Sequence, residues 1–446
     1  MSISARQAAV SALIQIHREG GYSNIVLDNL LNRLRLEDRE RGMATALVYG
    51  VVERRLTIDY LIDAVSRQPA DKLHPIVADI LRTGVYQLLW MDRVPEAAAV
   101  SEAVNLTRSM KCGHAAGFVN GVLRNVARSH TAILEKIPDG DEGLAIRHSC
   151  PVELIRLWRG AYGKTAEGLL AELHTRRPAV IRVNTLKIKV ENFISALQEA
   201  EIGHISHPRL PGYIILTQNE QQVTELKLAK LEKSWYYHQD SASGYCCLAL
   251  DARPGERVAD LCAAPGGKSL TLAQHMQNRG QILAGDIHPG KCDLLSKRAA
   301  ELGAAIVQTV CRDAAADCPK PLKGAFDRVL CDVPCSGLGV IRRKPEIRYK
   351  PLESFVELPA LQYRILEQSA KMVRPGGVLQ YSTCTLNPAE NEDIARRFLE
   401  NHPEFTPRPL GLEFLENPLG EPAWYRTLFP HLHDTDGFFI AGFRRL

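Results

Sequence analysis

The chain has 446 residues, a formal net charge of +4, and a composition that is 45% hydrophobic and 24% charged. This length exceeds one ordinary domain, so we expect two or three, each large enough to bury a core. The proportions of hydrophobic and charged residues are typical of globular proteins. No apolar run approaches the roughly 18 residues of a membrane span, which predicts a soluble protein. A mildly basic chain is compatible with a nucleic-acid partner but does not identify one.

The N-terminus and the cysteines predict a cytoplasmic protein with free thiols. Met1 to Arg6 leads directly into a helical pattern without the apolar stretch of a secretory signal. The eleven cysteines are scattered and odd in number, which argues against a disulfide framework. No Cys-x-x-Cys pair or nearby histidine pair accompanies them, so we predict no metal site. The sequence leaves the oligomeric state open, with a monomer as the simplest expectation.

The first region, residues 1–145, is predicted to be an all-α bundle. Its apolar residues recur at three- and four-residue spacing, at Ala8, Ala12, Leu13, Ile16, Val48, Val51, Val52 and Leu56. Helix breaks are expected at Gly20-Gly21, at Gln68-Pro69 and around Lys111-Cys112-Gly113. A basic cluster interleaved with acids is either a solvated helix surface or an RNA contact, and it comprises Arg33, Arg35, Arg39, Arg41, Arg54 and Arg55.

The second region, residues 146–234, is predicted to be a small α+β module that connects its neighbours. Glu153 to Gly160 is expected to be a short helix, and the pattern changes at Pro178. Alternating apolar residues then predict strands at Val180–Asn184 and Tyr213–Leu216, with a helix at Val190–Ala200 between them.

The third region, residues 235–446, is predicted to be a Rossmann-like α/β domain. Asp240 is a candidate cap for a first helix. Short apolar runs spaced by helices then predict a parallel sheet, with strands at residues 257–261, 281–286, 306–310, 328–332 and 377–381. A closing strand at residues 436–443 is expected, antiparallel and at the edge. Ligands of such sheets bind at the carboxyl ends of the strands, where the chemically distinctive motifs of this chain lie.

A glycine-containing turn follows the first strand of this region and is the candidate cofactor site. It comprises Cys262, Ala263, Ala264, Pro265, Gly266, Gly267 and Lys268. A P-loop would need glycine where Cys262 stands, and the turn does not supply the Gly-x-Gly-x-x-Gly of a dinucleotide site. S-adenosylmethionine fits best. Asp286, at the next strand end, can accept hydrogen bonds from both ribose hydroxyls, and Asp313, after the third strand, from the adenine amino group. The alternative is that both acids cap the helices that follow.

Two cysteines follow later strand ends, Cys335 in Asp332-Val333-Pro334-Cys335 and Cys384 in Ser382-Thr383-Cys384. A thiolate can add to C6 of a cytosine ring and make C5 nucleophilic enough to accept a methyl group. The ring also needs protonation or a hydrogen bond at N3, a task for a carboxyl group such as Asp332. Residues 387–392 are expected mainly to cap the next helix, with a role in orienting the site as the alternative.

The cofactor turn, the Cys335 motif and the Cys384 motif, in this order, resemble those of the RNA (cytosine-5) methyltransferases of the Fmu/Sun type. Within the first region, Glu40–Thr45 and Leu47–Val52 resemble the NusB-type RNA-binding bundle of ribosomal RNA members of that family. The resemblance spans nearly the whole chain. It implies a NusB-like bundle, a connecting module and a class I S-adenosylmethionine-dependent methyltransferase domain.

The resemblance also implies roles for the cysteines and a substrate. DNA cytosine methyltransferases attack with the Pro-Cys cysteine, so chemistry alone favours Cys335, whereas the family assigns attack to Cys384 and product release to Cys335. The implied substrate is small-subunit (16S) ribosomal RNA, before full subunit assembly. A transfer-RNA cytosine methyltransferase and a non-catalytic RNA-binding or antitermination factor are the alternatives.

The target cytosine must leave its stack or lie in an unpaired segment, so we expect a loop RNA substrate. Residues 339–350, directly after Cys335, carry five basic residues, which are Arg342, Arg343, Lys344, Arg348 and Lys350. They are either phosphate contacts or part of a disordered basic loop.

Overall fold

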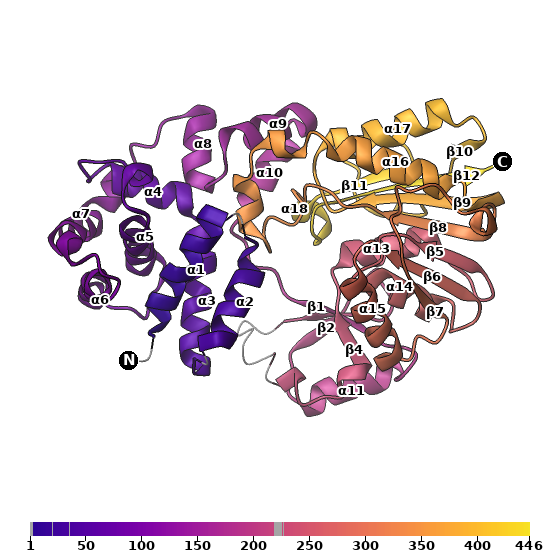
Figure 1. Cartoon of the computed structure of the whole chain (residues 1–446), viewed down its shortest axis with the longest axis horizontal. Coiled ribbons are helices and arrows are strands. Elements are labelled where there is room, and N and C mark those ends of the chain that lie inside the picture. The colour runs from indigo at the N-terminus through magenta and orange to yellow at the C-terminus, as the bar shows by residue number, and fades with distance from the viewer. Residues whose placement is uncertain (1–2, 20, 35, 218–224, 226) are drawn as a thin grey trace. The chain divides into compact units, whose positions relative to one another are not determined.

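The computed structural model describes residues 3–19, 21–34, 36–217, 225 and 227–446. They form two compact units (Figure 1). The helical unit comprises Met1–Thr175 and Ile341–Leu352, and the sheet unit comprises Arg176–Val340 and Glu353–Leu446. Gly20, at a predicted helix break, and Arg35, in the predicted basic cluster, lie outside the described residues. Among the described helices, none is long and apolar enough to cross a membrane.

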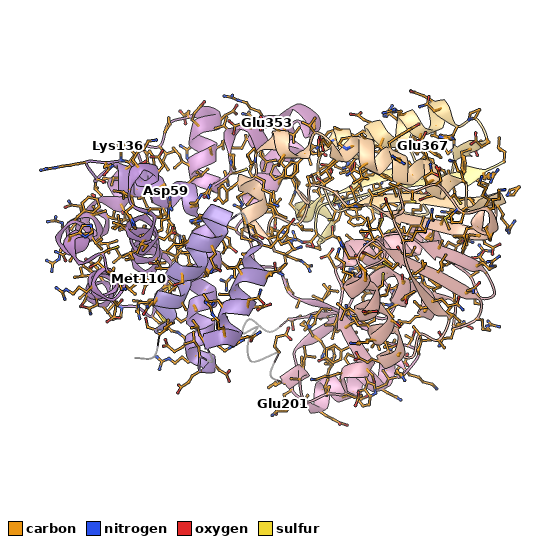
Figure 2. All side chains as sticks on the ribbon, viewed as in Figure 1. Asp59, Met110, Lys136, Glu201, Glu353 and Glu367 are labelled. Atoms are coloured by element: carbon orange, nitrogen blue, oxygen red, sulfur yellow. The ribbon has the colours of Figure 1, made fainter. Side chains whose placement is uncertain are left out.

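The apolar faces of the first seven α-helices of the helical unit enclose one core, and the side chains are drawn in Figure 2. The α-helices are α1 (Ala5–Glu19), α2 (Ser23–Leu34), α3 (Asp38–Glu53), α4 (Arg55–Asp63), α5 (Pro75–Trp90), α6 (Glu96–Ser109), α7 (Ala116–Leu134), α8 (Gly140–His148), α9 (Val152–Tyr162) and α10 (Thr165–Glu172). The predicted core positions Leu13 and Val48 are fully buried, whereas Leu56 is only partly buried. The predicted breaks near Pro69 and Cys112 both separate helices.

The segment Ile341–Leu352, which follows the Cys335 motif in sequence, belongs to the helical unit. Its Arg348 side chain is 1% exposed and donates hydrogen bonds to the backbone carbonyls of Glu53, at 3.3 Å, and Ser149, at 3.2 Å. Arg342 Nη1 lies 3.9 Å from Glu172 Oε2. The segment is therefore not a disordered basic loop, and at least Arg348 is a structural cation whose donors are committed to the protein backbone.

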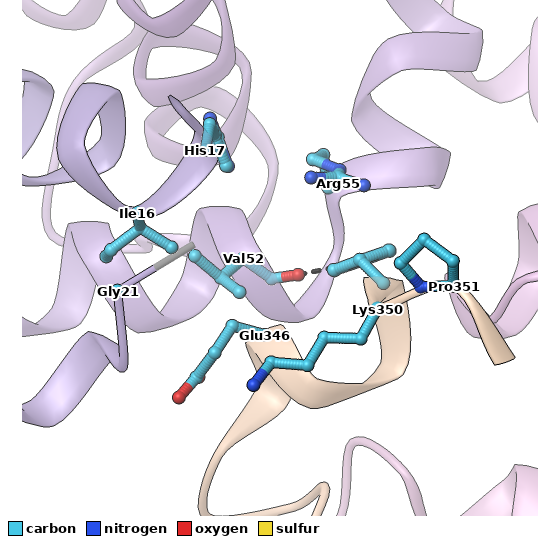
Figure 3. A pocket seen from close by; sticks show the side chains of 9 residues that line it. Ile16, His17, Gly21, Val52, Arg55, Glu346, Lys350 and Pro351 are labelled. Atoms are coloured by element: carbon cyan, nitrogen blue, oxygen red, sulfur yellow. Dashed lines mark hydrogen bonds between the residues drawn. The ribbon is translucent and has the colours of Figure 1, made fainter. Parts of the chain in front are cut away.

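Two arginines of the predicted basic cluster in the first region stack on aromatic rings of the helical unit. The Arg54 guanidinium lies 4.8 Å from the Trp90 ring centroid, and the Arg55 guanidinium lies 3.7 Å from that of Tyr349. Arg55 and Tyr349 also line a cavity of about 180 Å³ (Figure 3), together with Ile16, His17, Gly21, Val52, Glu346, Lys350 and Pro351. This cavity belongs to the helical unit, whereas every predicted cofactor and catalytic residue belongs to the sheet unit.

The sheet unit begins with a four-stranded antiparallel sheet in the order β2-β3-β1-β4. Its elements are β1 (Val180–Val183), α11 (Val190–Glu199), β2 (His204–Ser206), β3 (Tyr213–Leu216) and β4 (Tyr236–His238). The predicted strands and helix are confirmed, and the short strands β2 and β4 were missed. Phe193 and Leu197 of α11 are fully buried in the same cluster as Ile181 of β1, so the helix covers this sheet.

The larger, eight-stranded sheet of this unit has the order β10-β12-β9-β8-β5-β6-β7, with β11 paired to β12. Its strands are β5 (Arg257–Asp260), β6 (Gln281–Asp286), β7 (Val307–Cys311), β8 (Phe326–Asp332), β9 (Val373–Thr383), β10 (Phe405–Pro407), β11 (Tyr425–Leu428) and β12 (Phe438–Arg445). The strands from β5 to β9 pair in parallel, as predicted. The closing strand β12 is antiparallel to β9 but not at the edge, because β10 and β11 pair with it.

Helices bury both faces of this sheet (Figure 1). They are α13 (Ser241–Leu250), α14 (Gly267–His275), α15 (Pro289–Glu301), α16 (Leu358–Ala370) and α17 (Glu392–Asn401). The short α18 (Pro430–His433) follows β11. Val378 of β9 packs in the core of α13, α14 and α15, whereas the next residue, Leu379, packs in that of α16 and α17. This alternation explains why the strands are apolar runs in the sequence. The predicted cap is also confirmed, since Asp240 accepts a hydrogen bond from the Ala242 amide.

Candidate active site

The two predicted cysteines meet at one edge of the large sheet. Strands β8 and β9 are parallel neighbours, and Asp332 lies beside Ser382 in their register. Because both strands end here, the turns that carry Cys335 and Cys384 emerge side by side. The two Sγ atoms lie 3.4 Å apart, and both residues are half-buried.

This contact differentiates the two thiols. The hydrogen bond from Cys335 lowers the pKa of Cys384 despite its burial, and the positive charge of Lys268 acts in the same direction. The same hydrogen bond raises the pKa of Cys335 well above its ordinary value, and burial and the Glu390 carboxylate raise it further. Of the two thiols, Cys384 is therefore the one whose ionisation the site favours. Only the thiolate is an effective nucleophile.

An ion pair lies in the same site. Lys268 Nζ is 2.5 Å from Asp332 Oδ2, and the Ser382 hydroxyl donates to Asp332 Oδ1 at 2.8 Å. Burial alone would lower the pKa of Lys268, but the Asp332 carboxylate outweighs it and raises that pKa above its ordinary value. The proton of this pair therefore resides on Lys268. The sequence placed Lys268 only in the cofactor turn, and the structure brings its ammonium group to the predicted acid.

The predicted cofactor turn joins β5 to α14, and glycine is required in it. Gly266 has φ +104°, and a Cβ there would lie 2.3 Å from Leu295 Cδ1. Only glycine adopts this conformation without strain and leaves room for Leu295. The turn thus places the N-terminus of α14, which starts at Gly267, beside the strand end.

The residues around this turn fit S-adenosylmethionine. Asp260, the last residue of β5, is fully buried, and its Oδ1 has no hydrogen-bond partner among the described residues. Burial raises the pKa of Asp260 to about 7, although the Ser269 hydroxyl opposes this shift. An unpaired buried carboxylate oxygen suits the ammonium group of such a ligand. Sequence reasoning missed Asp260, although the rule that singled out Asp286, a carboxylate at a parallel strand end, would have found it.

The two acids assigned to the nucleoside lie in different environments. Asp286 is 7% exposed, and its Oδ1 accepts a hydrogen bond from the His288 amide at 3.0 Å. Asp313 is exposed, and its Oδ1 accepts from the Ala315 amide at 2.8 Å. Each carboxylate closes a local turn with one oxygen, so neither is the N-cap of a helix. In both, the second oxygen makes no hydrogen bond within the described part of the chain.

The structure adds two positioning groups that sequence reasoning did not separate from a helix cap. Glu390 and Asn391 are both fully buried. Asn391 does precede α17, but its side chain makes no capping hydrogen bond to that helix. The capping role expected for residues 387–392 is therefore wrong for Asn391. Its partners, Thr383 and Thr385, lie only eight and six residues earlier in the chain, but no local pattern in the sequence indicates these side-chain hydrogen bonds.

Comparisons with known proteins place the chain in a family. The model of the family described as 16S rRNA methyltransferase RsmB/F matches residues 247–444. The NusB family model matches residues 3–128, and the RsmF/B-like ferredoxin-like domain matches residues 150–224. Within the described residues, no group of three or more metal-ligating side chains is placed to hold a metal ion.

Similar proteins match over the full length. The probable ribosomal RNA small subunit methyltransferase B of Bacillus subtilis is 34% identical over 99% of both chains. The protein of that name from Synechocystis is 33% identical over 99% of this chain and 100% of its own. The crystal structure of PH0851 is similar with a TM-score of 0.81 and 27% identity over 100% of both chains. The chain therefore belongs to the 16S rRNA methyltransferase RsmB/F family, a family of S-adenosylmethionine-dependent RNA methyltransferases.

Proposed function

We propose that the protein methylates C5 of a specific cytosine in small-subunit (16S) ribosomal RNA, with Cys384 attacking C6 and Cys335 assisting release. The observation that carries this proposal is the 3.4 Å contact between the two thiols, and in the proposed mechanism Cys335 donates and Cys384 accepts. A cysteine that merely fills a core has no use for a lowered pKa. The relatives named small-subunit methyltransferase B support the choice of RNA.

The attack begins with the Cys384 thiolate. It forms a bond to C6 while the C5–C6 double bond donates its electrons into the ring, and N3 gains a proton. Lys268 holds that proton, and Asp332, 2.5 Å away, can orient the ring and relay it. C5 becomes nucleophilic as a result. When bound, S-adenosylmethionine supplies an electrophilic methyl group.

Release requires that the C5 proton leave to water, that the Cys384–C6 bond break and that N3 return the proton it gained to Lys268. The electrons of the C5–H bond restore the double bond, and those of the S–C6 bond return to Cys384. Cys335, 3.4 Å from that sulfur, donates its S–H hydrogen bond to the re-forming thiolate. A hydrogen bond to a developing anion lowers the barrier to its departure.

The cofactor is expected to lie along the strand ends of β5 and β6. The turn from Cys262 to Lys268 would approach its methionine part, Asp286 its ribose and Asp313 its adenine. Asp260 would pair with its ammonium group. The absence of any side chain on Gly266 and Gly267 leaves the α14 N-terminus open to a ligand.

The test incubates the protein with labelled S-adenosylmethionine and protein-free 16S rRNA, with transfer RNA in parallel, and identifies the methylated nucleoside. We expect 5-methylcytidine in 16S rRNA, at a reduced level when assembled small subunits replace the free RNA. Label in transfer RNA alone would retain the chemistry and overturn the substrate. Binding without methylation would favour the non-catalytic alternative.

The Cys384 role is tested separately on the same RNA. Cys335→Ala should accumulate a covalent protein–RNA adduct that resists denaturant, because attack survives and release is impaired. Cys384→Ala should form none. An adduct with Cys384→Ala but not with Cys335→Ala would reverse the two roles.

A further inference from the structure

Glu390 is a buried carboxylate held without a cation. It is fully buried, and no ion pair to it exists among the described residues. Its Oε2 accepts hydrogen bonds from the Ser336 amide at 2.9 Å and from Gln362 Nε2 at 2.8 Å. Its Oε1 accepts from the Ser336 hydroxyl at 2.5 Å and from Asn387 Nδ2 at 2.9 Å. Removing a carboxylate from water is costly, so a site that retains one with this many donors uses it for a specific purpose.

The purpose indicated by these contacts is to fix the Cys335 turn. Ser336 directly follows Cys335, and Glu390 accepts from both its amide and its hydroxyl. Two hydrogen bonds from one residue to one carboxylate restrict both the position and the rotation of that residue. The Cα of Cys335 is one peptide bond away, so its sulfur is restricted as well.

Asn391 fixes the other turn in the same manner. Its Oδ1 accepts from the Thr383 hydroxyl at 2.6 Å, and its Nδ2 donates to the Thr385 carbonyl at 3.0 Å. Thr383 and Thr385 are the two neighbours of Cys384. Asn391 therefore brackets the nucleophile from both sides along the chain.

The two residues that hold the cysteine turns are adjacent in the chain, and a hydrogen bond ties them to β9. Glu390 and Asn391 are consecutive, so one peptide unit links the group that holds Cys335 to the group that holds Cys384. The Tyr381 hydroxyl donates to the Glu390 carbonyl at 2.6 Å, which ties this unit to β9. The hydroxyls of Ser336 and Thr385 are also 2.6 Å apart, which links the two turns directly. We call these hydrogen bonds of Glu390, Asn391, Ser336 and Thr385 the frame.

We propose that Glu390 and Asn391 are positioning residues that hold the turns of Cys335 and Cys384 so that the two sulfur atoms lie within hydrogen-bond distance, 3.4 Å. This inference rests on the proposed function for its catalytic consequence. The Glu390 charge also raises the pKa of Cys335, together with the hydrogen bond to Cys384 and burial. Neither residue takes part in the bond changes, and their role is to select which sulfur reacts.

The test measures which cysteine is alkylated, and it needs no RNA. Folded protein is treated with limiting iodoacetamide at pH 7, and mass spectrometry quantifies the modified peptides of Cys384 and Cys335. Glu390→Gln replaces a carboxylate oxygen by a donor that cannot accept hydrogen bonds. We expect the ratio of Cys384 to Cys335 modification to fall about tenfold, as a change of about one unit in relative pKa would produce.

Ser336→Ala removes the hydroxyl contacts and keeps the amide contact and the charge, so the ratio should fall by a smaller factor. This variant decides the question if Glu390→Gln does not fold. The matched control is Asp393→Asn, an exposed acid in the same segment, which should leave the ratio unchanged. An unchanged ratio in folded Ser336→Ala and Glu390→Gln would overturn the proposal, and would show that the frame is merely structural.

Single-turnover methylation then links the frame to catalysis. Glu390→Gln should lower the rate of methyl transfer about 10- to 100-fold while the KM for RNA and the affinity for S-adenosylmethionine stay near those of the wild type. Failure of the wild-type protein to methylate any RNA would refute the proposed function and leave the alkylation result standing. A KM effect without a rate effect would refute the positioning role.

Discussion

The hydrogen bond between the two thiols makes a quantitative prediction about Cys335→Ala. This substitution removes the thiol whose sulfur lies 3.4 Å from Cys384 Sγ and which we propose as its hydrogen-bond donor. A hydrogen bond to a charged group contributes about 1.5–3 kcal/mol. One pKa unit corresponds to about 1.4 kcal/mol, so the pKa of Cys384 should rise by about one to two units.

The sign follows from the direction of the native shift. The pKa of Cys384 is lowered by the hydrogen bond from Cys335, so its thiolate persists to a lower pH than it would without that bond. In Cys335→Ala the thiolate is lost at a higher pH. The acidic limb of the alkylation rate at Cys384 should therefore move upward by about one to two pH units.

The assay follows alkylation of the Cys384 peptide by mass spectrometry between pH 6 and pH 10, using about equal reagent and protein. Cys318→Ala is the matched control, because Cys318 is another buried cysteine of the sheet unit without a role in the site. Its profile should superimpose on that of the wild type. A Cys335→Ala profile that also superimposes would refute the assignment of Cys335 as the donor.

Other substitutions test the remaining features of the structure. Lys268→Met should reduce single-turnover methylation about 100-fold or more and also slow Cys384 alkylation at pH 7, because Lys268 supplies both the proton and a charge that lowers the pKa of Cys384; unchanged alkylation would contradict that electrostatic role. Gly266→Ala should weaken binding of S-adenosylmethionine in calorimetry and lower the free energy of unfolding by about 1–3 kcal/mol, whereas Gly290→Ala, with open space at its Cβ position, should do neither. Asp286→Asn should raise the Kd for S-adenosylmethionine about tenfold and Asp313→Asn less, because Asp286 is buried and Asp313 is exposed; the reverse order would exchange their roles. Arg348→Met should lower the free energy of unfolding in urea by about 2–4 kcal/mol, since it strands buried carbonyls, and a change below about 0.5 kcal/mol would show that this cation is dispensable for folding.

Local patterns in the sequence determined the elements of this protein and named the candidate residues for its chemistry. The three- and four-residue spacing around Leu13 and Val48 specified helices because one face of each must be buried. Apolar runs specified the parallel strands because helices cover both faces of the sheet. Ligands of parallel sheets bind at the carboxyl ends of the strands, which all lie at the same edge, and this expectation singled out Asp286, Cys335 and Cys384. The boundaries at residues 145 and 234 remain predictions.

Only the tertiary structure decided how the groups act on one another. Sequence order separates Cys335 from Cys384 by 49 residues, and it is the pairing of β8 with β9 that brings their sulfur atoms to 3.4 Å. The sequence left phosphate contacts and a disordered loop as alternatives for the basic segment after Cys335, yet Arg348 is buried in the helical unit. A residue type fixes what a group can do in water, whereas its pKa and partners depend on burial and on neighbours distant in the chain. For that reason the sequence named two candidate nucleophiles, and only the tertiary structure shows that their sulfur atoms lie in contact and so influence each other's ionisation.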